Sequence, residues 1–376
     1  MSLQPTLHRD CYLTDAQFQR ERERIFWREW FCAGREEEVP AAGDYLLVEV
    51  AGEQVLVVRT REGSFQAHYN VCRHRGAQLV NDKAPRHRAA AEACPSGSFG
   101  TGIRCPYHNW TYNLDGSLRT APFLEEGDGF CKAELGLHPV AVECWGGFLF
   151  LNLTPAELGP GRTLSDQLAG APERVRRYPL AELRTARRIV YPVAANWKVI
   201  LENYNECYHC GPVHPELCRV VPAFRHKGGA GLDWDRGVPH REGAWTFTMS
   251  GTTNRQPFAG LDDDERVLHK GELMYPNFML SLSAEHAAAF TVWPEGPAKT
   301  TVTCDFLFHP EEMARRDFDP ADAVDFWDIT NRQDWTICES VQRGMGARVF
   351  ESGYYAPMEN LSLDMRRYIR DKLGEQ

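Results

Sequence analysis

The chain has 376 residues, a net charge of −10 and twelve cysteines. This length predicts two domains, and the acidic balance argues against nucleic acid or an anionic membrane as a partner. We find no apolar run long enough to span a bilayer and no core of a signal peptide. The cysteines lack the spacing of a disulfide framework, so we expect a cytoplasmic protein.

The first predicted element is a helix from Thr14 to about Phe31, which opens on a capping-box pattern between Thr14 and Gln17. Short strands follow as far as about Asn152. Residues 45–50 and 54–59 are expected to pair as a hairpin through a tight turn at 51–53. The piece at 82–102, which contains Cys94, is rich in Ala, Gly, Arg and Pro and indicates an inserted surface loop.

Two short motifs in this strand-rich part each combine a cysteine with a histidine. Cys72 and His74 form a C-x-H pair, and Cys105 and His108 form a C-x2-H pair. A Rieske [2Fe–2S] cluster needs two sulfur ligands on one iron and two imidazole nitrogens on the other. The alternative is a structural zinc site, but zinc modules usually pair like with like. We therefore predict a Rieske-type cluster on these four residues.

Residues 155–161 form a Pro- and Gly-rich linker, after which strands and helices alternate. Strands are expected at 187–193, 245–250, 288–293 and 300–308, and helices at 321–345 and 359–373. A strand-rich first domain followed by a mixed domain indicates an α+β fold.

A second constellation lies in the Glu206-x2-His209-x4-His214 motif. The spacing predicts a helix over 197–209 that Gly211-Pro212 ends, with Glu206 and His209 one turn apart on one face. His214 follows the break, where a loop can return it to His209. Two imidazoles and a carboxylate on one side of an iron leave its other positions open for dioxygen and substrate.

The carboxylate of this second site must come from elsewhere in the chain. Asp334 lies among apolar residues in the predicted helix 321–345, where an unpaired carboxylate is costly to bury. Asp325, Asp328 and Glu339 are competing candidates on the same helix. Glu206 has a simpler role open to it, as a hydrogen-bond partner that orients His209.

Together these motifs resemble the alpha (large) subunits of Rieske non-haem iron oxygenases. The resemblance rests on C-R-H-R-G at 72–76, C-P-Y-H-N-W at 105–110 and E-x2-H-x4-H at 206–214. The stretches N-E-C-Y-H-C-G-P-V-H-P-E-L at 205–217 and N-R-Q-D-W-x-I-C-E-x-V-Q-R-G at 331–344 resemble the branch that acts on glycine betaine, choline and carnitine.

The resemblance implies an N-terminal helical segment over 1–37 that packs on the catalytic domain, a Rieske domain over 38–160 and a helix-on-antiparallel-sheet catalytic domain over 161–376. It implies that Asp334 completes the iron site with His209 and His214. It also implies that Glu206 relays electrons from the cluster of a neighbouring subunit in a homotrimer or a dimer of trimers. The chain lacks a dinucleotide-binding fingerprint, so NAD(P)H would act only through a separate flavin/iron–sulfur reductase or a ferredoxin.

The branch resemblance further implies oxidative N-demethylation of a quaternary ammonium substrate such as glycine betaine. Aromatic rings can hold such a cation, and the stretch between the iron motifs supplies several, although any single one of them is better explained as ordinary core. The candidates are Trp245, Phe247, Tyr275, Phe278, Phe290 and Trp293. The alternatives are an aromatic-ring dioxygenase, an aromatic O-demethylase, a Rieske electron carrier without a second iron, and a zinc-stapled binding module.

Overall fold

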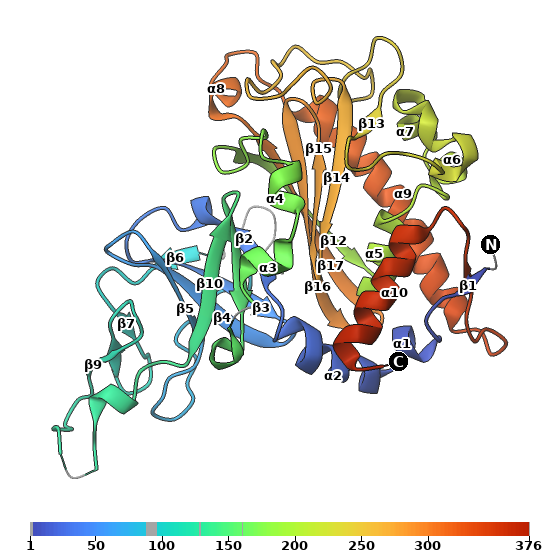
Figure 1. The fold of residues 1–376 in the computed structure, drawn as a ribbon. Helices are drawn as coiled ribbons and strands as arrows, with labels where there is room; N and C mark the ends of the chain where they lie inside the picture. Colours follow the sequence, from blue (N-terminus) through green and yellow to red (C-terminus); the bar gives the residue numbers. More distant parts are fainter. Residues whose placement is uncertain (1–2, 88–95, 128, 160, 376) are drawn as a thin grey trace. The chain divides into compact units, whose positions relative to one another are not determined.

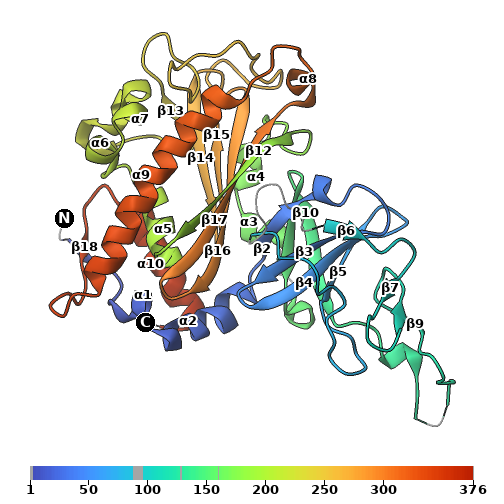
Figure 2. The same ribbon diagram turned by 180° about the vertical axis from the view of Figure 1, so that it is seen from behind.

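A computed structural model describes residues 3–87, 96–127, 129–159 and 161–375, so Cys94 and much of the predicted insertion lie outside the described residues. The chain forms two compact units (Figures 1 and 2). The smaller is Phe26–Gln167, and the larger combines Met1–Ile25 with Leu168–Gln376. No helix in the described ranges is long and apolar enough to cross a membrane.

The smaller unit is built on two antiparallel sheets. The larger sheet has the strand order β2-β11-β10-β5-β4-β3-β6. Its strands are β2 (Phe31–Arg35), β3 (Asp44–Val50), β4 (Glu53–Arg59), β5 (Phe65–Tyr69), β6 (Ser96–Ser98), β10 (Pro139–Trp145) and β11 (Phe148–Asn152). The second sheet consists of β7 (Ile103–Arg104), β8 (Thr111–Tyr112) and β9 (Leu118–Thr120).

The predicted hairpin is confirmed. β3 and β4 pair from Tyr45 opposite Val58 to Val50 opposite Glu53. Ala51 and Gly52 turn the chain with φ angles of 45° and 94°, as the two central residues of a hairpin turn that follows the twist of its strands require.

The division into units differs from the predicted boundaries at 37/38 and 160/161. β2 pairs with β11, so the chain joins the smaller unit from Phe26 onward. The N-terminal helix is also shorter than predicted. α2 (Asp15–Glu21), which Thr14 caps by accepting a hydrogen bond from the Gln17 amide, passes into a π-helical turn over Arg22–Phe26. Phe26 and Phe31 are fully buried, and their rings meet edge to face with centroids 6.3 Å apart.

The larger unit has a six-stranded antiparallel sheet in the order β12-β17-β16-β15-β14-β13. These strands are β12 (Arg184–Val193), β13 (Val238–Pro239), β14 (Leu268–Met274), β15 (Phe278–Leu282), β16 (His286–Gly296) and β17 (Lys299–Phe308). The 25-residue helix α9 (Ala321–Met345) lies across one face of the sheet with α5 (Trp197–Tyr204) and α10 (Asn360–Leu373) (Figures 1 and 2). The α+β class and the helix predicted at 321–345 are confirmed.

Two other predicted elements in this unit were wrong. The helix over 197–209 ends at Tyr204, where Asn203 and Asn205 are poor helix formers. Short helices α6 (Cys210–Val213) and α7 (Pro215–Val220) follow, so Gly211-Pro212 lies inside α6 instead of ending a helix. Residues 245–250 form an irregular loop instead of a strand, because the hydroxyls of Thr248 and Ser250 both donate to the Thr252 carbonyl.

Candidate metal centre and cavity

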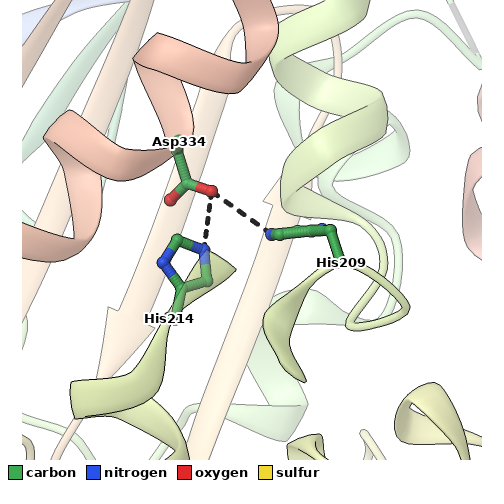
Figure 3. A group of neighbouring side chains, drawn as sticks. All are labelled: His209, His214 and Asp334. Carbon is green, nitrogen blue, oxygen red and sulfur yellow. Dashed lines mark hydrogen bonds and ion pairs between the residues drawn. The ribbon is translucent and has the colours of Figure 1, made fainter. Parts of the chain in front are cut away.

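Three predicted ligands meet in the larger unit. Oδ1 of Asp334 lies 2.9 Å from Nε2 of His214 and 3.2 Å from Nε2 of His209. One ligand atom from each of the three residues falls within 4.8 Å of the others. Figure 3 shows the two rings and the carboxylate pointing at one spot from α9 and from the chain around α6. Such a set of two imidazoles and one carboxylate is typical of a non-haem Fe(II) site with open positions.

The local fold explains this convergence. His209 and His214 flank the four-residue helix α6, so a single short turn separates the two rings. Their ring centroids lie 5.1 Å apart. Asp334 comes from the middle of α9, whose position against α5 is fixed where the Asn196 amide donates to Gln342 Oε1 over 2.9 Å. The site therefore joins two segments more than a hundred residues apart in sequence.

Each imidazole is also held from its other nitrogen. Glu206 accepts from Nδ1 of His209 over 2.5 Å and from the His209 backbone amide over 3.1 Å. Gln333 Oε1 lies 2.8 Å from Nδ1 of His214, and the Gln333 amide donates to Glu216 over 3.0 Å. Such partners fix the tautomer and leave each Nε2 free to bind a metal.

The protonation of the trio fits a site built for a cation. Burial alone would lower the pKa of His209, but its hydrogen bonds, above all the one to Asp334, raise the pKa to about 12. The two imidazoles hold the pKa of the buried Asp334 carboxyl below its ordinary value, although burial acts in the opposite direction. Without a metal, the Asp334 carboxylate thus favours the protonated form of His209, and a metal cation would replace that proton.

The competing acids of α9 make other contacts. Asp328 accepts from the Tyr191 hydroxyl over 2.8 Å and pairs with Arg332. Glu339 accepts from the Ala194 amide over 3.0 Å, and Asp325 is exposed. Asp334 is the only one of the four candidates that meets the two histidines within the described residues.

In the smaller unit the two predicted cluster loops share one backbone pattern. The Cys72 amide donates to the Ala77 carbonyl, and the Gly76 amide donates back to Cys72. The Cys105 amide donates to Trp110, and the Asn109 amide donates back to Cys105. Gly76 and Asn109 have φ angles of 74° and 59°, which close both turns. Two equivalent loops thus each present a buried sulfur.

The imidazoles of these loops lie together. The rings of His74 and His108 have centroids 4.7 Å apart, and Trp110 stacks on His74 at 4.9 Å. Nδ1 of His108 is buried without a hydrogen-bond partner in the described chain, as expected of a nitrogen meant for a metal. The Tyr112 hydroxyl accepts from the Arg73 amide over 3.1 Å and lies 3.2 Å from the Cys72 sulfur. This donor set fits a [2Fe–2S] cluster with two sulfur and two nitrogen ligands.

A cavity of about 350 Å³ opens beside the His209–His214–Asp334 site. Of the predicted aromatic residues, Phe247, Tyr275 and Phe290 line it. The prediction that Trp245 and Trp293 also form its wall was wrong, and Phe278 is likewise not on the wall. On β16, Phe290 faces the cavity and Trp293, three positions on, points to the opposite face of the sheet, as strand alternation requires. Trp245 belongs to the irregular loop.

Trp327 and His269 are two of the wall residues that the sequence analysis missed. Trp327 lies seven positions before Asp334 on α9, two helical turns away, and could have been found from that spacing. His269 on β14 carries no motif, and only the fold brings it to the cavity. The ring of Phe247 stacks on His269 with centroids 3.7 Å apart, and Trp327 lies 5.4 Å from Phe247.

Comparison with known proteins identifies both kinds of domain. Residues 29–143 match the Rieske [2Fe-2S] domain, and residues 180–375 match the ring hydroxylating alpha subunit (catalytic domain). The glycine betaine monooxygenase oxygenase subunit of Pseudomonas aeruginosa is 31% identical, with 93% of this chain and 85% of that protein aligned. The carnitine monooxygenase oxygenase subunit of Acinetobacter baumannii is 30% identical, with 90% and 84% aligned.

Solved structures extend this likeness. The apo form of a quaternary ammonium Rieske monooxygenase, CntA, matches with a TM-score of 0.74 and 25% identity, covering 98% of this chain and 96% of that one. Naphthalene 1,2-dioxygenase from Rhodococcus sp. has the same fold at a TM-score of 0.69 and 20% identity, covering 99% and 95%. The chain belongs to the ring-hydroxylating alpha-subunit family of Rieske non-haem iron oxygenases, the family that its two metal motifs indicated.

Proposed function

We propose that this protein is the oxygenase component of a monooxygenase that hydroxylates an N-methyl group of a trimethylammonium compound such as glycine betaine. The observation that carries the proposal is an aromatic cavity directly beside the His209–His214–Asp334 trio. The similarity to glycine betaine and carnitine monooxygenase subunits supports this substrate class.

The cavity wall suits a quaternary ammonium ion. Such a cation cannot donate hydrogen bonds, so the faces of aromatic rings hold it, with each ring contributing about 0.5–2 kcal/mol. Phe247 and Phe290 lie 5.4 and 5.6 Å from Trp327, close enough for the three rings to surround one methylated nitrogen. Among the described wall residues the only Lys or Arg is Arg174, and Glu272 binds its guanidinium through two hydrogen bonds of 2.7 and 2.6 Å.

The residues of the two sites have distinct tasks in this proposal. His209, His214 and Asp334 hold an Fe(II) ion, and Cys72, His74, Cys105 and His108 hold a [2Fe–2S] cluster. The two groups supply electron storage and activation of dioxygen when bound. Glu206 keeps His209 oriented and, in a homotrimer, relays electrons from the cluster of the neighbouring subunit. A separate reductase or ferredoxin in the cytoplasm supplies the electrons.

The products follow from the position of attack. One oxygen atom enters a C–H bond of an N-methyl group, and two electrons and two protons reduce the other atom to water. The N-hydroxymethyl ammonium product then collapses to a tertiary amine with two N-methyl groups, formaldehyde and a proton. The aromatic wall would also accept an arene, so ring hydroxylation or O-demethylation of an aromatic compound is the second candidate.

A substrate screen tests the proposal. The iron-loaded protein, with a surrogate reductase, is assayed for substrate-dependent O2 uptake and formaldehyde with glycine betaine, with its isostere 3,3-dimethylbutyrate, in which an uncharged tert-butyl group replaces the trimethylammonium group, and with a set of arenes. We expect turnover of the cation and little of the isostere, since only the cation gains from the ring faces. Turnover of arenes without turnover of trimethylammonium compounds would transfer the assignment to the second candidate.

A further inference from the structure

His269 differs from the other wall residues because it is polar, nearly fully buried and unbonded. Its side chain is 5% exposed, and its Nδ1 is buried without a partner in the described chain. A neutral imidazole has one N–H to donate and one lone pair to accept. Leaving such groups unpaired is costly, so an unpaired ring at a cavity needs an explanation.

The strand places this ring at the cavity. Along β14, His269, Gly271 and Leu273 alternate onto one face, and all three line the cavity. The face of the imidazole is covered by Phe247, with an interplanar angle of 11°. The ring edge is therefore the part left to interact with a ligand, and it does so through Nε2, because Nδ1 has almost no accessible surface.

Two neighbouring histidines show what an anchored ring looks like in this unit. His240 Nδ1 lies 2.9 Å from the Val267 carbonyl, and His286 Nδ1 lies 2.8 Å from Glu285 Oε1. Neither lines the cavity. Burial, together with these two rings, keeps the pKa of His269 well below its ordinary value. The cavity-facing ring is thus neutral at pH 7, and it adds no positive charge that would repel a cation.

The wall offers no free cation for an acidic group of the substrate. The described wall has a single guanidinium, that of Arg174, and Glu272 occupies it. A hydrogen bond to an oxygen of the substrate must then come from an uncharged donor. His269 lies 6.1 Å from Trp327 between ring centroids, so one small molecule can contact both.

We propose that His269 donates a hydrogen bond to an oxygen of the substrate and thereby selects trimethylammonium compounds that carry a carboxylate or hydroxyl over plain alkyl ones. The inference rests on the proposed function and assigns the polar end of the same site. A site built to bond a polar group rejects the analogue without it much more strongly than an apolar pocket rejects an extra group.

Two isosteric pairs of compounds test this role. Glycine betaine is paired with isobutyltrimethylammonium, and choline with propyltrimethylammonium. H269F keeps the stacked ring but removes both nitrogens, whereas H269Q and H269N restore an amide near Nε2 and Nδ1. H240F is the matched control, because His240 also packs on Phe247 but lies off the cavity wall. For each protein, kcat/KM and the anaerobic Kd are measured with all four compounds.

We expect H269F to lower kcat/KM and affinity for the oxygen-bearing compound about tenfold or more, equivalent to about 1.4 kcal/mol, and to change its isostere less than about threefold. H269Q or H269N should regain part of the loss, and H240F should preserve the ratios. The pair with the larger change identifies the group, carboxylate or hydroxyl. Equal losses for both members of a pair, or no recovery with either amide, would overturn the role of His269 and would leave the proposed function standing. Wild-type protein that neither binds nor oxidises any of the four compounds would overturn the proposed function itself.

Discussion

Gln333 Oε1 lies 2.8 Å from Nδ1 of His214, whose Nε2 faces Asp334 at 2.9 Å. Two consecutive residues of α9 therefore act on the same imidazole, one on each nitrogen. Because the amide oxygen can only accept, Nδ1 must carry a proton, and Nε2 is the nitrogen that faces Asp334 and that a metal would bind. Gln333, which precedes the proposed ligand Asp334 in sequence, thus orients the proposed ligand His214.

Replacement of Gln333 by Ala should weaken the mononuclear site without destroying it. Loss of a partner that orients a metal-bound histidine typically costs about 10–100-fold in metal affinity. Competition with a chelator measures this affinity, and the [2Fe–2S] absorption reports that the cluster is intact. Arg332→Ala, on the exposed side of the same helix, is the control. Equal iron affinity in the two variants would show that Gln333 does not orient His214.

Glu206→Gln separates orientation from electron relay. The amide still offers an oxygen to His209, so both cofactors should remain bound. We expect slower reoxidation of the reduced cluster in single-turnover experiments, because the residue proposed as the electron relay loses its negative charge. Glu216→Gln is the control, because the Glu216 carboxylate contacts Gln333 and not an imidazole of the site. An unchanged rate of reoxidation in Glu206→Gln would mean that Glu206 only orients His209. Activity of a monomeric protein would rule out electron transfer between subunits.

The cluster ligands can be tested by redox potential. His74→Cys or His108→Cys replaces a neutral imidazole by a charged thiolate and should lower the potential toward the range of all-cysteine clusters, a change of the order of hundreds of millivolts. Spectroelectrochemistry measures it on the brown-red protein. Colourless wild-type protein after anaerobic expression with ample iron would contradict a cluster at these residues.

The sequence predicted the parts of both sites that depend on local spacing. Cys72, His74, Cys105 and His108 lie in short motifs, and the α9 helix carries Asp334 at the predicted place. The choice among the four acids of α9 needed the fold, since the contacts of Asp328 with the Tyr191 hydroxyl and of Glu339 with the Ala194 amide come from other parts of the chain. His269 and the loop around Trp245 escaped prediction because cross-strand register and side-chain bonds to the backbone, which no local pattern encodes, place them.

Glu202 gives the larger unit a predictable pH dependence. Burial raises the pKa of this carboxyl from 4.5 to about 7, and the hydroxyls of Tyr12 and Tyr355 donate to it over 2.8 and 2.6 Å. Because the folded-state pKa is raised, the stabilisation is present at pH 4.5 and below and is lost as the pH rises through 7. Glu202→Gln should remove this loss, which amounts to about 1–3 kcal/mol. Denaturant unfolding from pH 5 to pH 8 measures it, and parallel pH profiles of the two proteins would contradict it.

The proposed function assigns the oxidation of an N-methyl group to the His209–His214–Asp334 site. Its most direct test is a single turnover of fully reduced protein with O2 and glycine betaine carrying 13C-labelled methyl groups, without reductase. One electron from the cluster and one from the iron suffice for one hydroxylation, so we predict labelled formaldehyde approaching one equivalent per iron site. Asp334→Ala should contain about two irons per chain instead of about three and should keep the cluster spectrum. It should release no labelled formaldehyde. Equal formaldehyde from Asp334→Ala, or none from the wild-type protein while an arene is oxidised, would contradict the account.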